Sequence, residues 1–120
     1  MEEVTLRVES LNAFFDEALA LGRRMDVGDD RPRAAKISFE SMAGLLKLLT
    51  ANRWTLMATL RKLGPSSTRA LARALDRDYR GVHADVALLI DAGLIVRDEQ
   101  AKIAMPWSRL TAEMDLGAAA

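Results

Sequence analysis

The feature that most constrains the fold is the segment RDYRGVHADVALLIDAGLI, residues 77–95, which has the spacing of one helix but two different ends. Val82, Val86 and Leu89 recur at helical intervals and predict an inward apolar stripe. Asp78 is a suitable N-cap, and Gly93 is expected to stop the helix. The outward positions are Tyr79, Arg80, His83 and Ala87. The pattern predicts a helix that is anchored by its apolar tail while its polar, cationic head faces a partner.

Three further helices are expected before this segment. Residues 68–75, TRALARAL, follow a possible N-cap at Ser66 or Ser67. Residues 53–63, RWTLMATLRKL, are expected to follow an N-cap at Asn52 and to end at Gly64-Pro65. The third helix is expected within residues 40–50, ESMAGLLKLLT. The residues expected to face inward from these helices are Met42, Leu45, Leu46, Leu49, Leu56, Leu60, Leu63, Ala70, Leu71, Ala74 and Leu75.

Strands are expected towards both ends of the chain. Two apolar runs flank the polar RDEQ within residues 94–106 and predict a β-hairpin. Residues 109–116, RLTAEMDL, alternate as a last strand with one buried face would, and residues 4–8, VTLRV, predict a half-buried strand. A short strand is expected at residues 36–39. Residues 11–25 predict a helix capped by Ser10 with a wide apolar face, formed by Leu11, Phe14, Phe15, Ala18, Leu19, Leu21 and Met25.

These elements predict a mainly α fold with a small β-hairpin wing, an α+β class. The order helix, short helix, tight turn, helix and hairpin is that of a winged helix-turn-helix, which we place in residues 36–116. Residues 1–35 are expected to form an N-terminal strand-helix arm and a linker, for dimerisation or partner binding; the polar linker spans residues 26–35. Residues 117–120 are expected to form a disordered tail.

The composition predicts a cytoplasmic protein. The chain has no cysteine, which fits a reducing compartment and leaves no disulfide framework. No apolar run approaches the ~20 residues that a membrane span needs, and the acidic start MEEVTLRVES does not resemble a signal peptide.

The charge of the chain is balanced overall but unevenly distributed. The formal net charge is zero, yet residues 47–80 contain eight basic residues and only Asp76 and Asp78 as acids. The flanking parts of the chain carry an excess of acids. This asymmetry indicates a local cationic field in the middle of the chain, although a solvated helical surface would have the same charges.

A helix with a cationic head and an apolar tail suits the DNA major groove, where only a few side chains reach the base edges. Arg80 is the first candidate, because its planar guanidinium can bind guanine through two hydrogen bonds. The start of the preceding helix is expected to point at a phosphate. The predicted DNA-binding residues are Ser67, Thr68, Arg69, Arg73, Arg77, Tyr79, Arg80 and His83, together with Arg97 and Lys102 beside the hairpin tip. The tip itself, Asp98-Glu99, is acidic, which argues against deep insertion of the hairpin.

Each candidate also has a structural interpretation. Arg80 could be a solvated surface arginine, and His83, the single histidine, could be a packing or surface group. Trp54 is expected in the core rather than as a platform for base stacking, and Trp107 is expected to anchor the final strand. Gly81 is expected to allow close approach of its backbone to DNA or to the preceding helix.

The sequence offers little for catalysis. One histidine and no cysteine exclude the usual metal clusters and most pairs of nucleophile and base. The seven glycines are isolated and form no phosphate-binding loop. We therefore expect no enzymatic activity, no cofactor and no metal.

The segment STRALARALDRDYRGVHADVALLIDAGLIVRDEQAKIAMP resembles the winged helix of MarR-type transcriptional regulators. More narrowly, the pattern SFES…LLT…RW…L…GP.S.R.LAR.L.RDY..VH.DV..L…GLI resembles a prokaryotic group of predicted DNA-binding regulators, over residues 38–106. The resemblance implies DNA binding, usually as a dimer, and implies that some members are antitoxins beside toxin genes. MarR-type proteins dimerise through long terminal helices, whereas this chain has one arm helix and a terminal strand.

Three functional hypotheses follow. The first is a sequence-specific regulator of transcription that binds double-stranded DNA as a homodimer and acts as a repressor. The second is an antitoxin that masks a small toxin and regulates its own operon through the same DNA-binding domain. The third is a scaffold for protein interactions, which has no need of eight bases between residues 47 and 80. The operator, an effector, and the choice between repression and activation are not encoded in a recognisable motif.

Overall fold

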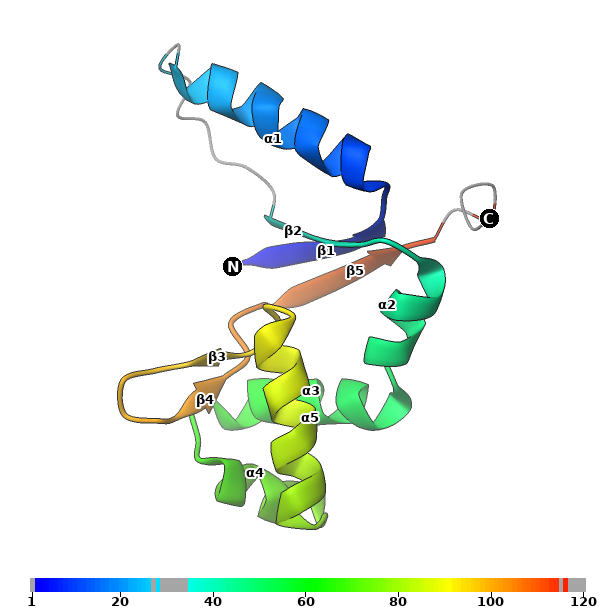
Figure 1. The fold of residues 1–120 in the computed structure, drawn as a ribbon. Coiled ribbons are helices and arrows are strands. Elements are labelled where there is room, and N and C mark those ends of the chain that lie inside the picture. The colour runs from blue at the N-terminus through cyan, green and yellow to red at the C-terminus, as the bar shows by residue number, and fades with distance from the viewer. Residues whose placement is uncertain (1, 27, 29–34, 115, 117–120) are drawn as a thin grey trace. The chain divides into compact units, whose positions relative to one another are not determined.

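The computed structural model describes residues 2–26, 28, 35–114 and 116 of the chain. It is a mixed α and β structure, so the predicted α+β class is confirmed at this level (Figure 1). The elements, in chain order, are β1 (Glu3–Val8), α1 (Leu11–Asp26), β2 (Ala35–Phe39), α2 (Met42–Leu48), α3 (Ala51–Leu63), α4 (Thr68–Leu75), α5 (Tyr79–Asp91), β3 (Val96–Arg97), β4 (Ile103–Ala104) and β5 (Arg109–Glu113). All the predicted helices and strands are present.

The chain divides into two compact units. The helical unit consists of Leu46–Arg109 with the start of the chain, and it contains α3, α4, α5 and the β3–β4 hairpin. The strand unit consists of Glu3–Leu45 with the segment from Leu110 onward. This division differs from the expected boundary between residues 35 and 36, because β2, beyond the expected linker, pairs with β1. Most of the linker at 26–35, and the tail at 117–120, lie outside the described residues.

Side-chain caps define where the three helices of the helical unit begin. The N-cap of α3 is Thr50, whose Oγ1 accepts a hydrogen bond from the Arg53 amide at 3.2 Å. The prediction of Asn52 as this cap is wrong, since the helix already begins at Ala51. Ser67 caps α4, with its Oγ 3.1 Å from the Ala70 amide, and Asp78 caps α5. Local side-chain chemistry thus starts each helix close to the predicted residue.

The turns after these helices also follow the sequence. Gly64 ends α3 with φ 77°, a left-handed value that favours glycine. Asp76 ends α4 with φ 52°, and the amides of Asp76 and Arg77 donate to the carbonyls of Arg73 and Ala72. Gly93, at φ 87°, follows α5, as predicted. The chain therefore turns tightly between α4 and α5, over the residues 76–78.

The core of the helical unit contains the predicted stripe of α5. Val82, Val86 and Leu89 are fully buried, as are most of the positions predicted from α3. The core residues of this unit are Leu56, Met57, Leu60, Leu71, Ala72, Val82, Val86, Leu89, Leu94, Ile95, Ile103 and Met105. All of them are apolar, so this unit has a hydrophobic core of its own.

Several predicted inward positions are wrong. Trp54 is 53% exposed, because the buried residues of α3 begin at Leu56, and two residues correspond to a rotation of about 200° around a helix. Leu46 and Leu63 are about half exposed. In α4, Leu71 is buried as predicted and Ala70 and Leu75 are half-buried, but Ala74 is exposed and its neighbour on the inward side is Ala72.

The β3–β4 hairpin is antiparallel, as predicted, with Val96 opposite Ala104 and Arg97 opposite Ile103. Ser66 and Ile103 exchange two backbone hydrogen bonds, which join the hairpin to the segment just before α4. Trp107 is half-buried, and its Nε1 donates to the Gly93 carbonyl at 3.2 Å. Trp107 thus holds the chain between the hairpin and β5 against the end of α5.

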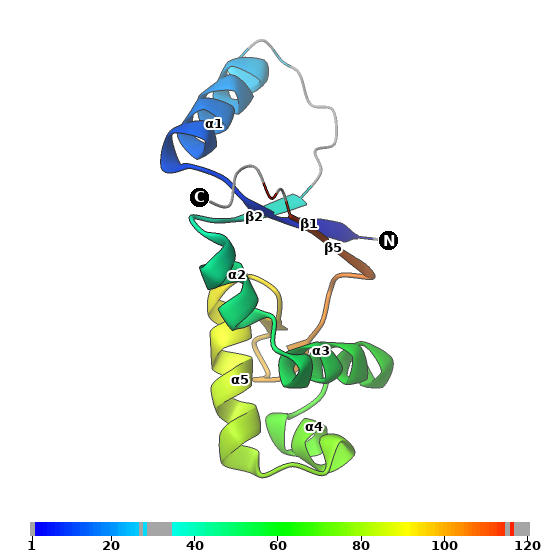
Figure 2. The ribbon, with the colours of Figure 1, turned by 90° about the vertical axis from the view of Figure 1, so that its right-hand side faces the viewer.

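The strand unit contains a three-stranded sheet in the order β2–β1–β5, with α1 on one side of it (Figure 2). β1 and β2 are parallel, in a register that runs from Val4↔Ala35 to Val8↔Phe39. Val4 and Leu6 are buried. The prediction that the last strand has a buried face is wrong for the single chain, since Leu110 is only half-buried and Met114 is exposed.

Candidate nucleic-acid interface

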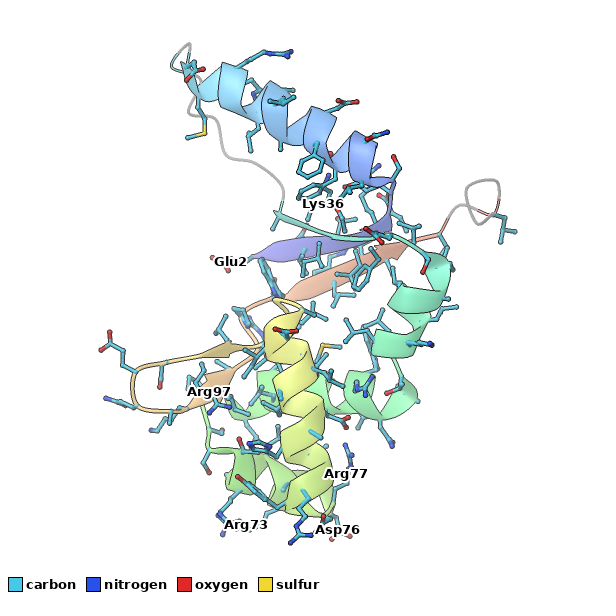
Figure 3. All side chains as sticks on the ribbon, viewed as in Figure 1. Glu2, Lys36, Arg73, Asp76, Arg77 and Arg97 are labelled. Atoms are coloured by element: carbon cyan, nitrogen blue, oxygen red, sulfur yellow. The ribbon has the colours of Figure 1, made fainter. Side chains whose placement is uncertain are left out.

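The predicted site residues gather where α4 meets the first turn of α5. Figure 3 shows Arg73, Asp76 and Arg77 at this junction, whereas Arg97 lies on the hairpin. The junction forms an open pocket of about 660 Å³. The residues that line the pocket are Arg69, Ala72, Arg73, Asp76, Arg77, Asp78 and Tyr79. Four of the predicted site residues therefore line one pocket, because a tight turn brings two helix ends together.

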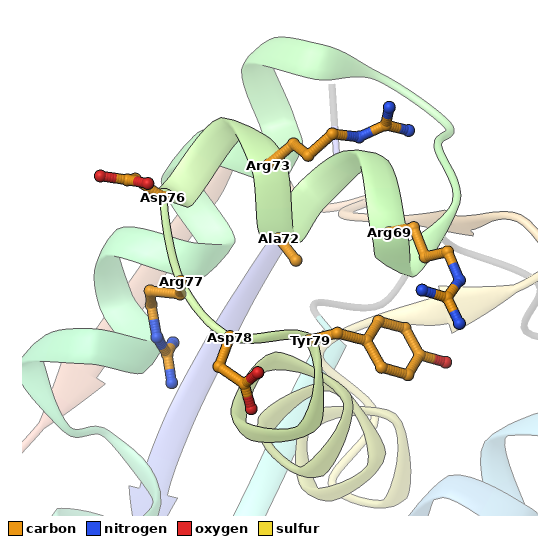
Figure 4. Close-up of a pocket in the computed structure, with 7 residues that line it drawn as sticks. All are labelled: Arg69, Ala72, Arg73, Asp76, Arg77, Asp78 and Tyr79. Atoms are coloured by element: carbon orange, nitrogen blue, oxygen red, sulfur yellow. The ribbon is translucent and has the colours of Figure 1, made fainter.

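Two of the arginines lie on the same side of α4. Arg69 and Arg73 are one helical turn apart, and their side chains extend from the same side of the helix (Figure 4). Asp76 points away in the opposite direction (Figure 4). Both arginines are exposed. Because both guanidinium groups lie on this side of α4, this side is cationic.

Tyr79 is held in place by two neighbours. The Arg69 guanidinium lies over its ring at 4.4 Å from the centroid, and the His83 ring lies 5.7 Å away at an angle of 41°. Tyr79 is half-buried, and His83 is exposed. The cation–π contact favours this arrangement of Arg69 and Tyr79.

Arg80 is exposed at the head of α5. Its backbone amide donates to Asp78 Oδ2 at 3.2 Å, which caps the helix. The outward positions His83 and Ala87 are also exposed. The predicted outward and inward faces of α5 are confirmed, since Val82, Val86 and Leu89 are buried on the other side, but the apolar tail is not wholly buried, because Leu88 is 46% exposed.

The start of α4 carries the remaining residues of this group. Ser67 is exposed, and Thr68 is half-buried. The Ser67 hydroxyl oxygen accepts the Ala70 amide as a cap, so its proton remains available to a further acceptor. The geometry is compatible with the predicted phosphate contact at this helix start.

The hairpin candidates are separate from the pocket. Arg97 and Lys102 are exposed and flank a tip in which Asp98 Oδ1 accepts the amides of Gln100 and Lys102, both at 2.9 Å. Ala101 has φ 63° in this tip. The Asp98 carboxylate shapes the tip, and the two acids Asp98 and Glu99 offset the charges of Arg97 and Lys102, so its field is weaker than that of α4.

Sequence reasoning missed an ionic network behind the head of α5. Asp85 accepts from Arg53 Nε through Oδ1 and from Arg77 Nη2 through Oδ2, each at 3.0 Å. Arg53 Nη1 also donates to the carbonyls of Lys47 and Leu48 at 2.8 and 3.2 Å. These contacts join the end of α2, the start of α3, the turn and α5. No local spacing pairs these residues, since Arg53 and Asp85 are 32 residues apart.

The network changes the interpretation of Arg77, which also lies beside Gly81. Arg77 was predicted to lie towards a sugar-phosphate backbone; in the structure one edge of its guanidinium is already paired with Asp85. A Cβ atom at Gly81 would lie 3.4 Å from Arg77 Nη2. This is an ordinary van der Waals distance to the end of a flexible side chain, so Arg77 does not by itself require glycine at residue 81.

The described residues contain no group of three or more His, Asp or Glu side chains that could hold a metal ion. None of the helices in the described ranges is long and apolar enough to cross a membrane.

These observations define a class: an α+β protein whose helical unit presents an arginine-lined junction between two short helices. The HVO_A0114 family model matches residues 48–112, and the chain belongs to this family. The matched segment begins at the last residue of α2 and ends within β5, so it contains the whole arginine-lined junction and the hairpin. No curated protein and no solved structure matches the chain.

Proposed function

We propose that the chain is a sequence-specific regulator of transcription that binds double-stranded DNA as a homodimer and represses by occupying a promoter. The fold of the helical unit is then a winged helix-turn-helix, with α4 and α5 as the helix-turn-helix and β3–β4 as the wing. The observation that carries the proposal is the division of α5: Val82, Val86 and Leu89 are fully buried, while Arg80 and His83 are exposed.

In this proposal the head of α5 enters the major groove. Arg80, the exposed arginine nearest the helix start, binds a guanine edge, and Tyr79 and His83 contact neighbouring bases. Arg69 and Arg73 extend from α4 and bind backbone phosphates, while Ser67 and Thr68 position the helix start at another phosphate. Arg97 and Lys102 bind phosphates beside the hairpin.

The first experiment selects bound fragments from random duplex DNA and then compares variants on the selected site. Arg80→Ala is expected to lose discrimination between the selected site and a scrambled one, on the order of 1–3 kcal/mol, because a bidentate contact to a base is removed. Arg109→Ala, an exposed arginine in β5, is the matched control and should bind as the wild type does. Unchanged discrimination by Arg80→Ala would refute the role of α5.

The second experiment measures the salt dependence of binding. Arg73→Ala is expected to weaken binding to every sequence about equally and to lower the slope of log K against log salt by about one unit, since one phosphate contact is lost. A protein that binds no fragment at low salt would refute the proposal as a whole.

A second candidate function is an antitoxin, whose strand unit masks a small toxin while the helical unit regulates the operon. The observation in its favour is that α1 has no buried residue and presents exposed Phe14, Phe15 and Leu19. Expression of each neighbouring open reading frame with and without this chain tests the idea. The antitoxin function is rejected when the chain relieves the toxicity of none of them.

A further inference from the structure

We propose that the exposed apolar face of α1 is the docking surface for α1 of a second copy of this chain, packed antiparallel, with Ala18 and Gly22 where the two helices cross. This deepens the proposed homodimer, on which it rests for the second copy. It names the element, the direction and the register of the interface, none of which DNA binding by itself requires.

The first observation is that α1 contacts its own sheet with one side only. Lys36 of β2 pairs with Glu17 and lies 5.9 Å from the centroid of the Phe14 ring. Leu21 and Arg24 are the half-buried residues of α1, and they lie at helical intervals from these two contacts. The other residues of α1 are exposed, so the rest of its circumference is open to a partner.

The second observation is an apolar stripe on the open part of α1. The stripe consists of Leu11, Phe15, Ala18, Leu19, Gly22 and Met25, which recur every three or four residues along one face. Its large members are between 54% and 60% exposed. A contiguous exposed apolar face of this kind is typical of an interaction surface. A second copy presents the same apolar face, so two copies can cover each other.

The third observation is a glycine in the middle of the stripe that the contacts of the chain do not explain. A Cβ atom at Gly22 would have no heavy atom within 4 Å, although glycine inside a helix is less stable than alanine. Ala18 lies one turn earlier on the same face. The distance between two packed helices depends on the side chains at their contact, so two small residues allow a close crossing. The crossing point is therefore placed between Ala18 and Gly22.

The fourth observation, the charges beside the stripe, determines the direction. Asp16 and Arg23 are exposed on the same flank, two helical turns apart, and neither forms an ion pair with the residues that the structure describes. In an antiparallel pair centred at the level of residue 20, Asp16 of each copy lies beside Arg23 of the other. A parallel pair would bring Asp16 and Glu17 together at one level and the two arginines at another. Like charges would then meet, which disfavours the parallel pair.

The same register also matches the large apolar side chains. Phe15 and Met25 are equally far from residue 20, on opposite sides of it, so Phe15 of one copy lies beside Met25 of the other. A thioether in contact with an aromatic ring is a favourable pair. Leu19, close to the twofold axis, lies near Leu19 of the second copy. The register thus places small residues at the crossing point and large ones on both sides of it.

The first arm of the test is cross-linking, for which the chain is suited because it contains no cysteine. Phe15→Cys and Met25→Cys are mixed and oxidised at a concentration at which light scattering shows dimers. We expect a disulfide between the two variants, since the antiparallel register brings these positions together. Identical positions are then about 15 Å apart along the helix axis, so neither variant should cross-link with itself. Self-linked Phe15→Cys, or no mixed product, would overturn the proposal.

The second arm exchanges the charges. Asp16→Arg and Arg23→Asp are each expected to weaken the dimer about tenfold at low salt, because an attraction becomes a repulsion at two symmetric places. The protein with both substitutions has the pair in the reverse sense, so it should recover the wild-type dissociation constant. Analytical ultracentrifugation measures the three variants. A double variant as weak as the single ones contradicts the register.

The third arm tests the close crossing. Ala18→Leu is expected to weaken the dimer more than tenfold, because a large side chain separates the helices at the crossing point. Ala20→Leu, on the opposite side of α1, is the matched control and should dimerise normally. Gly22→Ala should raise the helical stability of α1 and still weaken the dimer, two changes of opposite sign. An Ala18→Leu protein that dimerises as tightly as the wild type refutes the close crossing.

The outcomes for this interface and for the DNA function are distinguishable, since every arm is measured without DNA. A dimer that lacks the antiparallel cross-link overturns the interface and leaves DNA binding standing. An antiparallel dimer that binds no duplex supports the interface and refutes the DNA function. A wild type that is monomeric, and whose α1 instead binds the product of a neighbouring reading frame, overturns the interface in favour of the antitoxin function.

Discussion

At the scale of single residues, the strand unit contains an ionic cluster around Lys36. Lys36 Nζ lies 2.7 Å from Glu9 Oε1 and also pairs with Glu17 of α1, and the Ser38 hydroxyl donates to Glu9. Burial disfavours the charge of Lys36, but hydrogen bonds to Glu17 and Glu9 outweigh it and raise the pKa of Lys36. Hydrogen bonds from Lys36 and then Ser38 lower the pKa of Glu9. The cluster therefore stabilises the charged forms of both groups.

This cluster predicts a pH dependence for the strand unit. A carboxyl whose pKa is lowered on folding contributes stability that is complete above its unfolded value, about 4.3, and is lost as the pH falls through the folded value. We expect Lys36→Met to destabilise β1 and β2 at pH 7 and to lose less further stability at acid pH than the wild type. Urea titration followed by the NMR signals of Leu6 and Ile37 at pH 7 and pH 3 measures this.

Lys62→Met, an exposed lysine of α3, is the control for that titration. At the alkaline end the sign is opposite. Because the pKa of Lys36 is raised, its contribution is present below about pH 10.4 and is lost as the pH rises through the folded value. Equal losses of stability on acidification in the wild type and Lys36→Met would contradict the role of the cluster.

At the scale of elements, the stability of the helices in the helical unit depends on the residues that cap their N-termini. Thr50→Ala is expected to destabilise this unit by about 1 kcal/mol, because the Arg53 amide loses its acceptor. Asn52→Ala is the matched comparison: Asn52 is exposed in the first turn, and alanine has the higher helix propensity, so stability should be unchanged or slightly increased. Urea unfolding followed by the fluorescence of Trp54 and Trp107 measures both variants. A larger cost for Asn52→Ala would restore the sequence-based assignment of the cap.

At the scale of the whole molecule, the strand unit buries few apolar side chains. Among the residues that the structure describes, it buries Val4, Leu6 and Leu45, while α1 contributes no buried residue. The exposed large apolar residues of α1 and the C-terminal segment are Leu11, Phe14, Phe15, Leu19, Met25, Met114 and Leu116. Exposed apolar side chains in this number are typical of surfaces that bind a partner. This apolar surface supports the proposed homodimer.

The proposed dimer can be tested with substitutions in α1. The wild type is expected to be a dimer at micromolar concentration by light scattering, and Phe15→Glu with Leu19→Glu should produce a monomer, since two charges would enter an apolar contact. Ala20→Glu, on the opposite side of α1, introduces a charge outside the apolar face and should leave the dimer intact. The helical unit should keep its melting temperature in all three proteins. A monomeric wild type would reject the arm as the dimer interface.

What the sequence alone determined is local in the chain. The helix 79–91, its cap at Asp78, its stop at Gly93 and its inward stripe of Val82, Val86 and Leu89 follow from spacings of a few residues, and the structure has all of them. The hairpin and the strands were also predictable, because the alternation of apolar and polar residues and the turn residues are patterns between neighbours in the chain.

Only the tertiary structure decided which distant residues meet. The parallel register of β1 with β2, the exposure of Trp54, and the pairing of Arg53 and Arg77 with Asp85 depend on how separate elements pack. A sequence states which residues are charged or apolar, but not which charge lies opposite another across a fold. The arginines of the junction were visible in the sequence as a cluster of charge, whereas the carboxylate that pairs with Arg53 and Arg77 reaches them only once α3 and α5 are packed together.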